Sequence, residues 1–173
     1  MNPESVIAVI EDAFKDVERP TESLRQFKLT DDKGMSCEIT QEEWSAAGKN
    51  RIDRRWSDIP DEEIEECGCQ LAHMQEREFV YFLPAYMRFA INHYKLPIWK
   101  SDILGSTVFA LNPSSKNQDT YKYNLRQYSC LNQAQAKAIV CYLDFVIRFA
   151  DEVERPDAQR AKDKFWTQRV IIT

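Results

Sequence analysis

The sequence predicts a mostly α-helical protein, organised as one compact domain over residues 1–173. Apolar residues make up 43% of the chain and aromatic residues 12%, which is enough to build a core and argues against disorder. The chain holds only 4 glycines, fewer than the turns of a β-sandwich or barrel usually need. Several segments also repeat apolar residues at helical spacing. These three observations favour helices over sheets.

The N-terminal segment carries the signals of a helix start. Asn2 can cap the helix, Pro3 suits the first helical position, and Pro20 ends the segment. One face is apolar, through Val6, Ile10, Phe14 and Val17. We therefore expect the first helix to begin near residue 3 and to stop before Pro20.

Residues 21–60 are mixed in character. Apolar and polar residues alternate briefly before a turn at Asp31–Gly34. This pattern is compatible with a small β-hairpin that pairs residues of about 25–30 with residues 35–39. The sequence Thr40-Gln41-Glu42-Glu43 is a capping box that predicts a short helix ending near Gly48. An irregular basic stretch follows, and Pro60 opens an acidic helix over Pro60–Glu66.

Residues 75–94 show the strongest helical pattern. Phe79, Leu83, Met87 and Ile91 recur at four-residue spacing, and almost every side of the helix is apolar. This helix should be central, with Leu83 and Met87 fully buried. Pro84 lacks an amide hydrogen, so we expect a kink or a break there, with a new run starting at Ala85.

The C-terminal half alternates between helices and one clear loop. Ile103–Leu111 suggests a short helix, and Asn112–Asp119 has the composition of a loop. Asn132 can cap a last major helix over about 133–153, and a further helix is expected over about 157–168.

Charge and cysteine usage restrict the environment and the partners. The net charge of −5 makes nucleic-acid binding unlikely, although Lys49, Arg51, Arg54 and Arg55 form a local basic cluster beside Trp56. The 5 cysteines form no regular framework and are interpreted as free thiols. The N-terminus lacks the basic start of a signal peptide, and polar residues interrupt the most apolar stretch, Phe79–Tyr94. We expect a cytoplasmic protein that does not enter a membrane.

The sequence contains no familiar catalytic or nucleotide-binding motif, and two alternatives stay open. Cys67, Cys69 and His73 are metal-ligand types, although the paired cysteine motifs of zinc sites are absent. A small enzyme could instead use a polar pocket beside Pro84, holding Arg88, His93 or a cysteine. No cofactor is predicted in either case.

Four patches resemble a bacterial family of uncharacterised proteins. The segment Tyr81–Met87 is similar to its aromatic-Leu-Pro-Ala-aromatic core, and Trp56–Pro60 is similar to its Trp-x-x-Ile/Leu-Pro motif. Residues 10–20 resemble its opening helix, and 128–143 its closing helix. The chain departs from the pattern at Met74–Glu76, where Thr-Pro-Glu is usual. The resemblance implies a small helix-rich domain and brings no activity, cofactor or site residue.

The preferred functional hypothesis is a non-catalytic protein that binds a protein partner, for example to neutralise it or to serve as a scaffold. An apolar anchor rimmed by charge is a common layout for an interface hot spot. The acidic run after Trp56 offers that layout, so the predicted interaction surface comprises Trp56, Asp58, Ile59, Glu62, Glu63, Glu65 and Glu66.

Overall fold

The computed structural model describes residues 2–34, 37–113 and 116–171, and this part of the chain is helical without a strand. The α-helices are α1 (Pro3–Phe14), α2 (Leu24–Lys33), α3 (Gln41–Gly48), α4 (Asp61–Cys67), α5 (Glu76–Asn92), α6 (Ile103–Ala110), α7 (Gln118–Gln127), α8 (Gln133–Phe149), α9 (Arg155–Ala161) and α10 (Thr167–Ile171). Short 3₁₀ turns cover Trp56–Asp58, Leu71–His73 and Tyr128–Cys130, and a π-helical stretch, Lys162–Trp166, joins α9 to α10. The prediction of a mostly helical fold is confirmed.

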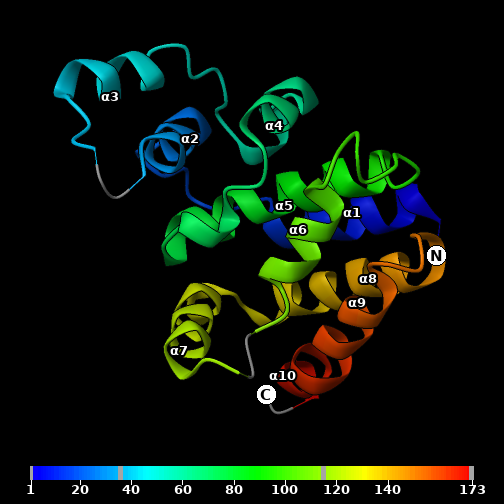
Figure 1. Cartoon of the computed structure of the whole chain (residues 1–173). Helices are drawn as coiled ribbons and strands as arrows, with labels where there is room; N and C mark the ends of the chain where they lie inside the picture. Colours follow the sequence, from blue (N-terminus) through cyan, green and yellow to red (C-terminus); the bar gives the residue numbers. More distant parts are fainter. Residues whose placement is uncertain (1, 35–36, 114–115, 172–173) are drawn as a thin grey trace.

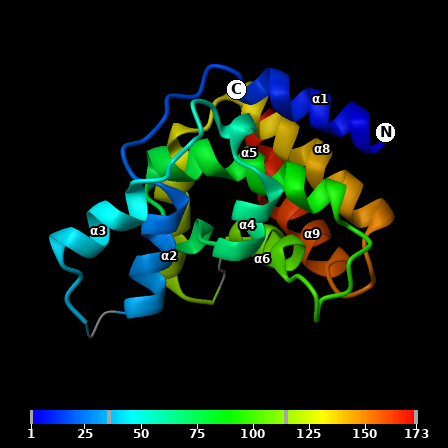
Figure 2. The same cartoon turned by 90° about the horizontal axis from the view of Figure 1, so that it is seen from above.

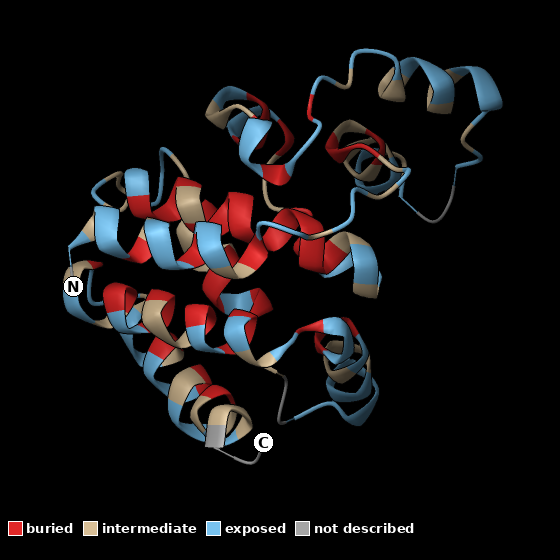
Figure 3. Ribbon diagram, turned by 180° about the vertical axis from the view of Figure 1, so that it is seen from behind, coloured by how far each residue is buried: buried red, intermediate tan, exposed pale blue. Residues whose placement is uncertain are grey.

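Helix α5 lies at the centre of the molecule. It packs against α1 and α6, and α1 lies along α8 (Figures 1 and 2). Most of the 17 residues of α5 are buried, and Leu83 and Met87 are both 0% exposed, as predicted. In contrast, α3 has no buried residue, and Figure 3 shows it coloured as exposed or intermediate. The core therefore sits between α1, α5, α6 and α8.

The predicted break at Pro84 is wrong, because α5 runs without interruption from Glu76 to Asn92 with Pro84 inside it. A proline removes one backbone hydrogen bond and crowds the preceding turn, at a cost of about 3 kcal/mol in a helix interior. Pro84 and its neighbours on both sides are buried. The burial of these side chains offsets the cost and keeps the segment helical.

Side-chain caps begin several helices where the sequence predicts them. The side chain of Asn2 accepts a hydrogen bond from the amide of Ser5 at 2.8 Å. Thr40 and Glu43 form the expected capping box, and Asn132 forms another with Gln135. These caps satisfy amide groups that have no partner inside the helix.

The predicted β-hairpin over 25–39 is wrong, because α2 occupies its first half. Ser23 and Gln26 form a capping box at its start, and this signal outweighs the short alternation that suggested a strand. Gln26 also donates to the carbonyl of Trp44 at 3.1 Å, which ties α2 to α3. Gly34 ends the helix with a φ of 64°, a conformation that favours glycine. Part of the second predicted strand, residues 35–36, lies outside the described residues.

Three other elements differ from prediction. The predicted loop Asn112–Asp119 ends early, because Asn117 caps α7 by accepting from the amides of Asp119 and Thr120; residues 114–115 of that loop lie outside the described residues. Helix α8 ends at Phe149, before the predicted 153, and the helix expected over 157–168 is divided by the π-helical stretch.

The π-helical stretch brings the C-terminal segment onto the core. Ala158, Ala161 and Trp166 are each 0% exposed. The indole nitrogen of Trp166 donates to the carbonyl of Leu111 at 2.7 Å, and its ring lies 4.9 Å from that of Tyr128. None of the helices within the described residues is long and apolar enough to cross a bilayer.

Candidate interaction surface

The two apolar members of the predicted interaction surface lie in the core. Trp56 is 3% exposed and Ile59 2% exposed, and the indole nitrogen of Trp56 donates to the carbonyl of Phe14 at 2.9 Å. The carboxylate of Asp58 accepts hydrogen bonds from the backbone amides of Arg54 and Arg55, at 3.0 and 2.8 Å. These bonds close the 3₁₀ turn that begins at Trp56. Trp56 and Ile59 therefore offer no anchor to a partner.

The acidic members of that surface divide into paired and exposed residues. Arg25 donates to both carboxylate oxygens of Glu66, at 2.9 and 2.8 Å, and lies 3.7 Å from Glu63. Glu63 is buried, and burial raises the pKa of its carboxyl group although the charge of Arg25 opposes this. Glu62 and Glu65 face solvent. What remains of the predicted surface is an acidic helix face without an apolar centre.

The basic stretch before Trp56 contains a buried ion pair that sequence reasoning missed. Arg51 donates to both carboxylate oxygens of Asp53 and to the carbonyls of residues 20–22. The hydroxyl of Tyr81 on α5 donates to Asp53 at 2.6 Å. Burial raises the pKa of Asp53, but the hydrogen bonds from Arg51 and Tyr81 outweigh it and hold that pKa below its usual value. Arg51 is thus committed to the fold rather than to a nucleic acid.

The residues of the metal alternative do not converge on one point. The Nε2 of His73 lies 3.1 Å from the carboxylate of Asp31. Burial raises the pKa of Cys67 to about 11 and that of Cys69 to about 12, so both thiols stay protonated in the metal-free protein. Within the described residues, no three His, Cys, Asp or Glu side chains are arranged to hold a metal ion. The structure therefore does not support this alternative.

The residues of the enzyme alternative form a structural network. Asp61 lies 3.0 Å from Arg88 and 2.9 Å from the Nε2 of His93. Arg88 also donates to the carbonyls of Ser57 and Ile59, so it ties the end of α5 to the start of α4. Neither Arg88 nor His93 lines either of two cavities of about 640 Å³ found elsewhere on the surface. Arg88 and His93 therefore do not form the polar pocket that this alternative expects beside Pro84.

A tight turn between α5 and α6 exposes a tryptophan that the sequence analysis did not single out. The amide of Lys100 donates to the carbonyl of Pro97 at 2.8 Å, which closes a four-residue turn. The central residues of this turn, Ile98 and Trp99, are 56% and 87% exposed. A hydrogen-bonded turn thus presents two large apolar side chains to solvent.

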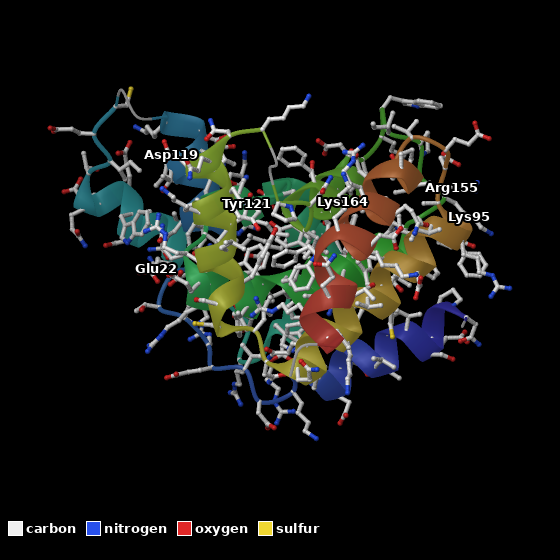
Figure 4. All side chains as sticks on the ribbon, turned by 90° about the horizontal axis from the view of Figure 1, so that it is seen from below. Glu22, Lys95, Asp119, Tyr121, Arg155 and Lys164 are labelled. Carbon is white, nitrogen blue, oxygen red and sulfur yellow. The ribbon has the colours of Figure 1, made fainter. Side chains whose placement is uncertain are left out.

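The turn forms one wall of a cavity of about 250 Å³, here named the Trp99 groove. The segment after α5 and the turn between α8 and α9 lie side by side at this end of the molecule (Figures 1 and 2). Lys95 and Arg155 mark the same end in Figure 4. The groove is lined mainly by Tyr94, Ile98, Trp99, Leu104, Asp151, Val153 and Glu154.

Exposed apolar side chains gather at this groove. Val153 is 69% exposed and lies in the groove with Ile98 and Trp99. Other large exposed apolar residues in the described part of the chain do not line it, namely Val9, Ile52, Phe109 and Tyr121. Single exposed apolar residues are common, whereas a cluster marks a binding surface. A sequence signal existed: the apolar run Leu96–Trp99 follows α5, contains a proline and is flanked by lysines.

The structure thus defines a helical protein with a small, mostly apolar groove and, among its described residues, no three His, Cys, Asp or Glu side chains placed to hold a metal ion. The chain belongs to the Family of unknown function (DUF6714), whose sequence model matches residues 2–170. The comparisons with curated proteins and with solved structures found no match.

Proposed function

We propose that this protein acts without catalysis, by binding a protein partner through the Trp99 groove. The observation that carries the proposal is the 87% exposure of Trp99 at the apex of a hydrogen-bonded turn. Tryptophan is among the residues most enriched at interface hot spots. Leaving an indole in water is unfavourable, and a partner that covers it recovers the free energy of apolar burial.

The turn also lowers the entropic cost of binding. The closing hydrogen bond from Lys100 to Pro97 fixes the backbone that carries Trp99 before a partner arrives. Side chains and loops that are already ordered lose less freedom on association. The Trp99 groove is therefore suited to receive one or two partner side chains at the centre of a larger contact.

The acidic face of α4 keeps a secondary place in the proposal. Glu62 and Glu65 are exposed, and charges of one sign mainly increase the rate of association with an oppositely charged partner. Asp58, Glu63 and Glu66 are engaged within the protein, so their contribution is smaller. We therefore keep this face outside the binding site, where its charges attract a basic partner only at long range.

The proposal extends to the setting in which the protein works. We propose that residues 1–173 act as one domain in the bacterial cytoplasm. The support is that all 5 cysteines are free thiols in the structure, as a reducing compartment requires. The packing of α1 along α8 also joins the two ends of the chain in one core.

Affinity capture from the native host tests the proposed function. The wild type, Trp99→Ala and Phe109→Ala are compared by quantitative mass spectrometry, and each captured partner is then purified and titrated. Phe109 is the matched control, because it is 68% exposed and lies outside the groove. A hot-spot tryptophan should cost about 2 kcal/mol or more of binding free energy when removed.

We expect Trp99→Ala to weaken binding of a captured partner by about thirtyfold, which corresponds to that free energy. Phe109→Ala should bind as the wild type does. Equal partner recovery and equal affinity for wild type and Trp99→Ala would refute the proposal. So would equal losses in the two variants, since the groove would then have no special role.

A further inference from the structure

The charged side chains that line the Trp99 groove are both carboxylates. Asp151 and Glu154 come from the turn between α8 and α9. Within the described residues, neither side chain has a hydrogen-bond or ion-pair partner. Other acids of this protein, such as Glu66 with Arg25, are paired within the fold. The two unpaired acids of the groove are distinguished by the exposed side chains of Ile98, Trp99 and Val153 that line it with them.

The carboxylate of Glu154 is held against α6. Its Oε1 and Cγ both lie 3.8 Å from the point where a Cβ on Gly105 would stand. Glu154 is half-buried in this position, so its carboxylate has lost part of its hydration. A partly desolvated carboxylate without a counter-ion favours a cation in the adjoining space.

The aromatic residues of the groove favour the same ligand charge. A cation over an aromatic face is attracted by the ring, and tryptophan is the strongest of the aromatic side chains in this respect. The ammonium of Lys95 already lies 5.4 Å from the centre of the Tyr94 ring. Trp99 stands 87% exposed beside the two acids.

Arg155 and Lys95, both labelled in Figure 4, do not pair with the two acids of the groove. Arg155 donates through Nε to the carbonyl of Ala150 at 2.8 Å, and the ammonium of Lys95 lies over the ring of Tyr94, itself a residue of the groove. Neither Arg155 nor Lys95 lines the groove. The charge of Asp151 and Glu154 is therefore left for a group that comes from outside.

We infer that the Trp99 groove recognises a partner segment in which a basic side chain, Arg or Lys, stands next to an apolar one. This inference rests on the proposed function and specifies its partner. The basic group lies between Trp99 and the carboxylates of Asp151 and Glu154. The apolar neighbour packs on Ile98 and Val153. Charge complementarity thus selects the segment, and the exposed indole supplies most of the affinity.

Selection from a random peptide library tests this inference without knowledge of the natural partner. Peptides displayed on phage are selected on the intact protein, and the enriched sequences are compared between wild type and three variants. The variants are Trp99→Ala, the double change Asp151→Asn with Glu154→Gln, and the double change Glu62→Gln with Glu65→Gln. The last is the matched control, because it removes the same charge from an exposed face of α4.

We expect the wild type to enrich peptides that carry Arg or Lys beside an apolar residue. Removing the two groove carboxylates should weaken the binding of these peptides by about three- to tenfold, as expected for the loss of two partly exposed ion pairs. The loss should shrink at high salt, and the α4 control should bind like the wild type. Trp99→Ala should abolish the enrichment.

The outcomes separate the two proposals. If the enriched peptides depend on Trp99 but are apolar without a basic residue, the charge inference fails and the proposed function stands. If basic peptides are enriched but the α4 control loses as much affinity as the groove double variant, the attraction is unspecific and the inference also fails. If no peptide depends on Trp99, both proposals fail.

Discussion

Trp56 and Trp99 occupy opposite environments, although each lies in a short turn and has a basic residue directly beside it. Trp56 is 3% exposed and donates to a carbonyl 42 residues away in the chain, at the end of α1. Trp99 is 87% exposed and stands at the apex of a turn held only by local backbone hydrogen bonds. The environment of a tryptophan is thus decided by which distant element reaches it, and local sequence does not encode that contact.

The largest effect should follow from removing the buried tryptophan. Trp56→Ala should lower the free energy of unfolding by about 3–5 kcal/mol, because it leaves a cavity in the core and removes the hydrogen bond from the indole to the carbonyl of Phe14. A denaturant titration followed by circular dichroism measures this change. A loss below about 1 kcal/mol would mean that Trp56 is not a core residue, and the contrast with Trp99 would disappear.

A smaller effect should follow from weakening the polar network next to Trp56. Asp53→Asn keeps the shape of the side chain but removes the charge opposite the buried guanidinium of Arg51. We expect a loss of about 2–3 kcal/mol in the same titration at neutral pH, since hydrogen bonds to charged groups are involved.

The pH dependence of this loss gives an independent check. The pKa of Asp53 in the folded protein lies below its ordinary value of 3.8, so the ionised carboxylate stabilises the fold above that pH. This stabilisation is lost as the pH falls through the range below 3.8. The difference in melting temperature between wild type and Asp53→Asn should therefore narrow on acidification. A constant difference would mean that Asp53 does not titrate as the structure implies.

The smallest effect on stability should follow from removing the exposed tryptophan. Trp99→Ala should change the free energy of unfolding by less than about 0.5 kcal/mol, because the indole makes few contacts in the free protein. It should also remove the fluorescence component that acrylamide quenches most strongly, since Trp56 and Trp166 are buried and Trp44 is only partly exposed. A large loss of stability, or unchanged quenching, would place Trp99 inside the fold and contradict the contrast.

The sequence predicted the structure best where local helix signals and the spacing of apolar residues agree. The stripe around Leu83 and Met87 correctly placed the central helix, and the caps at Asn2, Thr40 and Asn132 correctly placed helix starts. It failed where a short apolar alternation was preferred to the capping signal at Ser23, which is the stronger of the two. The break expected at Pro84 is also absent, because tertiary burial outweighs the local cost of proline, and a kink there stays a prediction.

The candidate site was harder to predict than the fold. Trp56 and Ile59 were assigned to the surface because an acidic run follows them, yet contacts from distant residues bury both. The Trp99 groove joins residues 94–105 to residues 151–154, and no sequence pattern links these two segments. The run Leu96–Trp99 did carry a usable signal, because its apolar residues do not continue the buried face of a helix.

The π-helical stretch at Lys162–Trp166 holds one residue more than an α-helical turn would. Its backbone hydrogen bonds join residues five apart instead of four, so deleting one residue would restore α-helical spacing without rotating the segment that follows. Trp166 would then keep its hydrogen bond to the carbonyl of Leu111 and its place in the core. This segment should therefore tolerate the deletion of one exposed residue, such as Lys164, better than a regular α-helical turn of the core would.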